Sequence, residues 1–214
     1  MKTSRQWWLA TGFLIVAVSV SATPNGVQLV DDDLQPVADA VIAIYGDGTA
    51  PTATINKRAD VDQVDRQFTP YVSVVEAGTR VYFPNSDDIR HHVYSFSPAK
   101  RFELRLYHGT TAEPVVFEQA GKVVLGCNIH DDMIGYIYVV DTPYYAVTDA
   151  SGAARFVQLP EGNLRYQVQH PQLAEPVVGE LSAASELKTI NVGRLLPDPR
   201  KTKPRTELEA LFDR

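Results

Sequence analysis

Short runs of alternating apolar and polar residues, separated by turn signals, set the strongest limit on how this chain can fold. The runs lie at residues 27–30, 41–45, 71–75, 80–83, 92–96, 102–106, 115–117, 122–125 and 136–140. An alternation with a period of two residues directs one side of each strand toward a core. No sustained helical period appears before the end of the chain, where residues 208–212 fit one helical turn. The pattern therefore predicts an all-β protein built as an antiparallel sandwich.

Cys127 is the only cysteine of the chain, so no internal disulfide is available. A leftover cysteine in an exported protein forms an intermolecular bridge, stays a free thiol or binds a metal. His130 and Met133 follow Cys127 at spacings of three residues, and a second imidazole is available upstream in the pair His91 and His92. Two histidines, a cysteine and a weak axial methionine make a blue-copper electron-transfer site. These residue types therefore predict bound copper.

The first 22 residues have the pattern of an export signal. Lys2 and Arg5 precede an apolar stretch at 7–20, and small residues end at Ala22. The stretch is short for a bilayer span. We predict a cleaved signal peptide at 1–22, no membrane span after cleavage, and a periplasmic or secreted location; an uncleaved anchor is the alternative. Cleavage leaves 18 basic against 26 acidic residues, which argues against a nucleic-acid partner.

The two ends of the mature chain differ in character from its middle. Residues 26–46 read as strand, turn and strand, and residues 141–193 alternate short strands with glycine and proline turns. Together they resemble carboxypeptidase-regulatory or transthyretin-like modules. The resemblance implies a small discontinuous β-sandwich module, with a domain at 50–140 inserted into it. The alternative is that 26–46 supplies the first strands of the central sandwich. Residues 194–214 are predicted to be an exposed tail.

The central domain resembles the cupredoxins, among them plastocyanin, pseudoazurin and amicyanin. The resemblance is carried by the segments 68–70, 77–79, 81–85, 91–93 and 126–130. The Cys-x2-His-x2-Met spacing is that of amicyanin, and genome-labelled methylamine utilisation proteins are also similar. The resemblance implies a Greek-key β-sandwich with one type 1 copper that carries single electrons. Its partner would be a redox protein such as a c-type cytochrome or a periplasmic dehydrogenase.

The same resemblance implies which upstream histidine is the ligand. In the family this ligand is commonly followed by asparagine and an apolar strand residue, and aligning that pair with His92 and Val93 selects His91. His92 then takes the place of the asparagine, where a contact with Asn128 would tie the two ligand segments together. His92 stays the alternative to His91. The implied metal ligands are His91, Cys127, His130 and Met133.

Other functions stay open on these residues. A copper-storing or copper-delivering protein would favour Cu(I) and release it, and a structural β module would carry a degenerate metal site. A nucleophilic pair of Cys127 and His130 is conceivable, but it leaves His91 and Met133 without a role. A site with four protein ligands also keeps no open position for a substrate, so we do not expect an enzyme.

Overall fold

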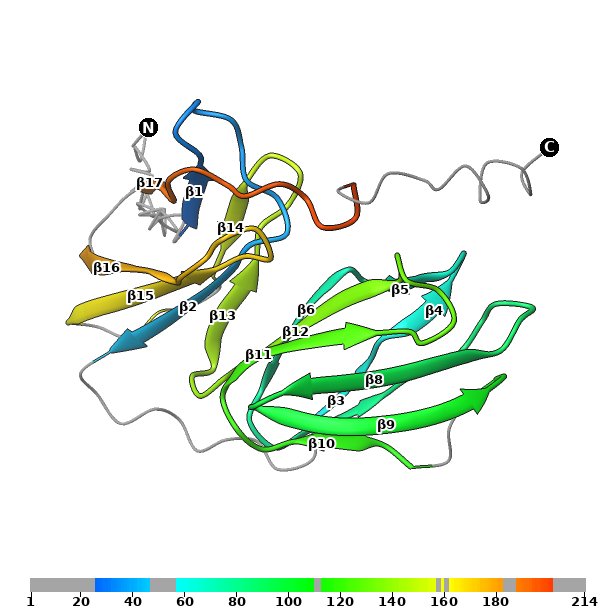
Figure 1. Cartoon of the computed structure of the whole chain (residues 1–214). Helices are drawn as coiled ribbons and strands as arrows, with labels where there is room; N and C mark the ends of the chain where they lie inside the picture. Colours follow the sequence, from blue (N-terminus) through cyan, green and yellow to red (C-terminus); the bar gives the residue numbers. More distant parts are fainter. Residues whose placement is uncertain are drawn as a thin grey trace, which may run out of the picture.

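The structure, a computed structural model, describes residues 26–46, 57–109, 113–156, 159, 162–182 and 188–201. All the regular structure in these ranges is β-strand, which confirms the predicted all-β class. Figure 1 shows two bodies of strands, one formed by the middle of the chain and one by its two ends. The predicted signal peptide and the turn at 208–212 lie outside the described residues. No helix of the described ranges is long and apolar enough to cross a membrane.

The middle of the chain forms a sandwich of two main sheets, ordered β6-β12-β11-β8-β9 and β10-β7-β3. The first sheet contains β6 (Val72–Glu76), β8 (His91–Ser97), β9 (Lys100–Tyr107), β11 (Gly121–Gly126) and β12 (Ile134–Val140). The second contains β3 (Arg58–Asp60), β7 (Thr79–Tyr82) and β10 (Val115–Phe117). A hairpin of β4 (Asp62–Val64) and β5 (Gln67–Thr69) completes this body. Strands β3 to β5 were not expected, because charged and polar residues make up most of 58–69.

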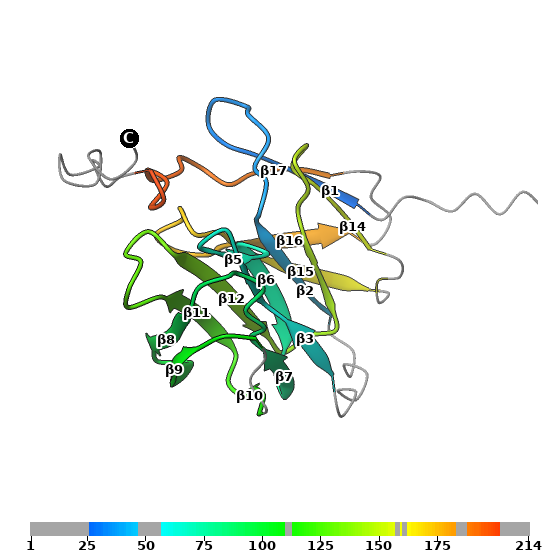
Figure 2. The ribbon, with the colours of Figure 1, turned by 90° about the vertical axis from the view of Figure 1, so that its right-hand side faces the viewer.

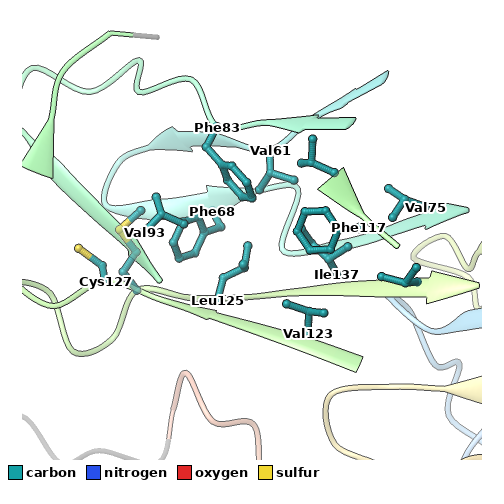
Figure 3. Packing of buried hydrophobic residues seen from close by; sticks show 13 residues of the cluster. Val61, Phe68, Val75, Phe83, Val93, Phe117, Val123, Leu125, Cys127 and Ile137 are labelled. Carbon is teal, nitrogen blue, oxygen red and sulfur yellow. The ribbon is translucent and has the colours of Figure 1, made fainter. Parts of the chain in front are cut away.

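Apolar side chains fill the space between these two sheets (Figure 3). Phe83 and Phe117 are fully buried there. Cys127 lies at one end of the cluster and Val75 at the other. Each fully buried side chain of this size contributes about 1.5–3 kcal/mol. The sandwich therefore has a source of stability that does not require a metal, and one end of its core supports the cysteine.

The two ends of the chain combine in the second body. One sheet is ordered β13-β2-β15-β16 and the other β14-β1-β17. The first consists of β2 (Val41–Gly46), β13 (Tyr144–Val147), β15 (Asn163–Gln169) and β16 (Val177–Ser182). The second consists of β1 (Gly26–Val30), β14 (Ala153–Arg155) and β17 (Lys188–Asn191). Because β2 pairs with both β13 and β15, we propose that 26–46 and 141–193 form one discontinuous module.

Strand β2 lies between two apolar clusters, as its continuous apolar sequence requires. Ile42 and Ile44 pack in the core of their own module, whereas Val41 and Ala43 pack with Tyr138 of β12. Figure 2 shows β2 and β15 between the sheet of β1 and β17 and the β6–β12 part of the central sandwich. The alternating faces of one strand thus join the two bodies.

His170 is buried beside this junction, directly after β15. Its Nδ1 accepts a hydrogen bond from the backbone N–H of Gln172 at 3.2 Å. The ring also makes a backbone hydrogen bond with Ala38, and burial is the main cause that lowers the pKa of His170 to about 4. Its ring therefore stays neutral in the folded protein well below the pH at which an unfolded histidine takes up a proton.

His170 should make the fold sensitive to acid. An unfolded histidine has a pKa near 6.5, so its stabilising effect is complete above about pH 6.5 and is lost as the pH falls toward 4. The free energy of unfolding of the copper-free protein, measured in urea, should fall less steeply between pH 6.5 and 4 in His170→Gln than in wild type. The difference in slope should be up to about 1.4 kcal/mol per pH unit. The exposed His108→Gln is the control. Parallel pH profiles for wild type and His170→Gln would contradict this role.

Candidate metal centre

Three side chains from two segments meet at one end of the central sandwich. His91 begins β8, Cys127 directly follows β11, and His130 lies in the loop before β12. Cys127 Sγ lies 3.9 Å from His91 Nδ1 and 3.8 Å from His130 Nδ1. Metal bonds of about 2.1 Å to nitrogen and about 2.3 Å to sulfur that meet near 120° leave about 3.8 Å between the donor atoms. The three donors are therefore spaced to share one ion.

The loop after Cys127 turns its ligand-type residues inward. The backbone N–H of Met133 donates to His130 O at 3.0 Å, which closes the turn. Cys127 and Met133 are both buried and line the same groove, whereas Asn128 and Ile129 between them are exposed. The loop thus buries the thiol and the thioether in the core of the sandwich, and His130 brings Nδ1 to the thiol from a partly exposed position.

The two imidazoles of the site differ in exposure. His91 is fully buried, and His130 is only partly buried. Burial lowers the pKa of His130, and the charges of His91 and Arg66 lower it further, while Asp87 acts in the opposite direction. The net shift favours the neutral ring, which is the form that binds a metal.

His92 points away from this group. Its Nε2 lies 3.0 Å from Glu103 Oε1 on β9, and its ring packs against Tyr94 with centroids 5.6 Å apart. Neighbouring residues of a strand face opposite sides, so the structure brings His91, and not His92, to Cys127 and His130. The expected contact between His92 and Asn128 was wrong: no hydrogen bond joins them among the described residues, and His92 Nδ1 has no partner.

Asp87 is a residue of the site to which the sequence analysis gave no role. Its Oδ2 lies 2.6 Å from His91 Nε2, the ring nitrogen that faces away from Cys127. Burial raises the pKa of Asp87, but hydrogen bonds from the Arg66 N–H, from His91 and from the Asp65 N–H together bring it below its usual value. The carboxylate beside the His91 imidazole is therefore ionised. An aspartate four residues before a candidate ligand is the only signal for it in the sequence.

The loop that carries Asp87 is fixed by Asn85. Asn85 Nδ2 donates to Ile89 O and to Tyr107 O, both at 2.9 Å. Asn85 Oδ1 accepts from the Asp87 N–H at 3.1 Å. Asn85 is itself buried, so these bonds hold the segment between β7 and β8 in one conformation. This conformation places Asp87 and His91 beside each other.

No family model matches the chain, and no curated protein matches it. The solved structures that resemble part of the chain include an amicyanin and a cupredoxin. A reduced Cu(I) form of an amicyanin mutant is 19% identical over 46% of this chain and 98% of its own, with a TM-score of 0.35. A purple cupredoxin from Nitrosopumilus maritimus is 19% identical over 39% of this chain and 99% of its own, with a TM-score of 0.34.

A third resemblance is to a copper-containing nitrite reductase from Thermus scotoductus SA-01. It is 22% identical over 52% of this chain, with a TM-score of 0.36. The match spans only 28% of the reductase chain. The chemistry of the site rests on the distances between its own side chains.

Gly135 should be needed to seat the hairpin beside the site. A Cβ at Gly135 would lie 2.8 Å from Phe68 Cβ, and the buried Phe68 belongs to β5. We expect Gly135→Ala to lower the unfolding free energy of the copper-free protein by about 1–3 kcal/mol. In the control Gly126→Ala the new Cβ meets the outer end of the partly exposed Tyr94 ring, which can move, so the loss should be smaller. Equal losses in urea unfolding would show that β5 is not packed as described.

Proposed function

We propose that the protein binds one copper ion and carries single electrons between redox partners. The ligands would be His91, Cys127 and His130, with Met133 as the weak axial donor. The observation that carries the proposal is the spacing of 3.9 and 3.8 Å from one thiol sulfur to two imidazole nitrogens. A soft thiolate, two imidazoles and a thioether form the donor set of blue-copper sites. When bound, the copper supplies a couple that gains and loses one electron.

The surroundings of the ligands suit electron transfer better than catalysis or delivery. Cys127, His91 and Met133 are buried, so the chain holds them in place in either redox state. A delivery protein must expose its ligands to a receiving site, and an enzyme must leave a position for substrate. Here only His130 is partly exposed. This exposure supports a carrier whose partner approaches at the edge of one imidazole.

The exposed side chains near His130 support contact with a protein. Ile89, in the segment of His91, is 38% exposed, and Ile129, in the segment of Cys127 and His130, is 48% exposed. We propose this end of the molecule as the contact surface for a redox protein such as a c-type cytochrome or a periplasmic dehydrogenase. The location, periplasmic or secreted, is proposed from the predicted signal peptide.

Replacing each of the two neighbouring histidines in turn tests the ligand set. His91→Gly should remove the blue band of the copper-loaded protein, because it removes a primary donor, and added imidazole should restore the band by filling the vacant position. His92→Ala should keep the band, because the His92 ring is paired with Glu103. The measurement is visible absorption with and without imidazole. Loss of the band in His92→Ala and its retention in His91→Gly would assign the ligand to His92 instead.

Met133→Leu tests the axial donor. The variant should keep copper and colour but raise the reduction potential, because loss of a weak thioether donor destabilises Cu(II) relative to Cu(I). Leucine has a similar volume and preserves the packing of this buried position. Protein-film or solution voltammetry measures the change. An unchanged potential and spectrum would mean that Met133 does not contact the copper.

A further inference from the structure

We propose that Asp87 is a positioning residue that sets the reduction potential of the copper site through His91. The proposal rests on the proposed function, because it concerns the same ion. Its basis is a carboxylate oxygen at 2.6 Å from His91 Nε2, while Nδ1 of the same ring faces Cys127 Sγ at 3.9 Å. The carboxylate and the thiol thus lie on opposite sides of one imidazole.

The carboxylate is held in place from its other side. Asp87 Oδ1 accepts from the Asp65 N–H at 2.6 Å, and Oδ2 accepts from the Arg66 N–H at 2.9 Å. Both donors form the turn of the β4–β5 hairpin, with φ of 52° and 56°, and this two-residue turn has the positive φ values of a type I′ hairpin. Each carboxylate oxygen therefore has a backbone donor, and the charge cannot turn away from His91 without breaking these bonds.

The chemical effect of this contact follows from charge. A carboxylate that accepts a hydrogen bond from Nε2–H polarises the N–H bond. This raises the electron density at Nδ1 and makes that nitrogen a stronger ligand. The side chains of His91 and Asp87 are 0% and 10% exposed, so water screens the negative charge weakly. Both effects stabilise Cu(II) more than Cu(I). Asp87 should therefore hold the reduction potential below the value that a neutral partner would give.

The pair of His92 and Glu103 provides an internal contrast. It is also an imidazole–carboxylate contact, at 3.0 Å, but the Glu103 side chain is 59% exposed. His92 faces away from Cys127, and Glu103 has water on one side. This pair has the same chemical groups, but its imidazole is not a proposed ligand and its carboxylate is not buried.

The test is Asp87→Asn in the copper-loaded full chain. Asparagine keeps the shape and can keep an oxygen toward His91 Nε2 and the Arg66 N–H. It removes the charge, and its NH2 group then replaces the oxygen that accepts from the Asp65 N–H. We expect the blue band to remain, Cu(II) affinity to fall roughly 10- to 100-fold, and Cu(I) affinity to change much less. With 59 mV per tenfold for a one-electron couple, the reduction potential should rise by about 60–120 mV.

Two control variants separate this effect from a general loss of negative charge. Asp88→Asn removes an exposed carboxylate from the next position of the same loop, and Glu103→Gln removes the carboxylate beside His92. Both should leave Cu(II) affinity within about threefold of wild type. A potential for Asp87→Asn equal to those of the two controls would overturn the proposal while leaving the copper site intact. Absence of a blue band in the wild type would instead overturn the proposed function.

A measurement on the wild type covers the case in which Asp87→Asn fails to fold. In the diamagnetic Cu(I) protein labelled with 15N-histidine, the His91 Nε2–H proton should appear as a downfield resonance that exchanges slowly with water. A short bond to a buried carboxylate deshields and protects such a proton. A His91 Nε2–H that exchanges as fast as that of the exposed His108 would overturn the proposal.

Discussion

The close approach of one thiol sulfur to two imidazole nitrogens is the constraint on which the proposed copper site depends. The chain has no disulfide to enforce it. Strands β8 and β11 do so instead, because Gly126 pairs with Tyr94 and this register carries Cys127 to the side of the sheet where His91 enters. The apolar core behind Cys127 keeps the sulfur buried. A metal therefore meets a site whose shape the strands already determine.

The described residues of the second body pack on the sandwich away from the site. It packs on β6 and β12 through the cluster that contains Val41, Ala43 and Tyr138. Figure 1 shows β8 beginning and β11 ending on the far side of the central body from β1 and β17. The groups that hold the proposed copper ligands and the groups that join the two bodies are thus separate.

The sequence revealed those parts of the site that lie close together along the chain. The spacing of Cys127, His130 and Met133 identified one loop, and short apolar runs identified the long strands of the central sandwich but not β16 of the second body. Alternation also explains why the expected contact of His92 failed, since His92 must face away if His91 faces inward. The sequence did not indicate the role of Asp87, because its backbone donors lie in the turn of a hairpin made mostly of charged and polar residues. The module boundaries, the cleaved signal and the assignment of four ligands stay predictions.

Titration of the copper-free protein with Cu(II), followed by visible absorption, tests the central claim most directly. A thiolate bound to Cu(II) in this donor set gives an intense blue band from sulfur-to-copper charge transfer. The account predicts that the band grows linearly and saturates at one equivalent of copper. A protein that takes up no stoichiometric copper, or takes it up with only the weak absorption of nitrogen and oxygen ligands, would contradict it.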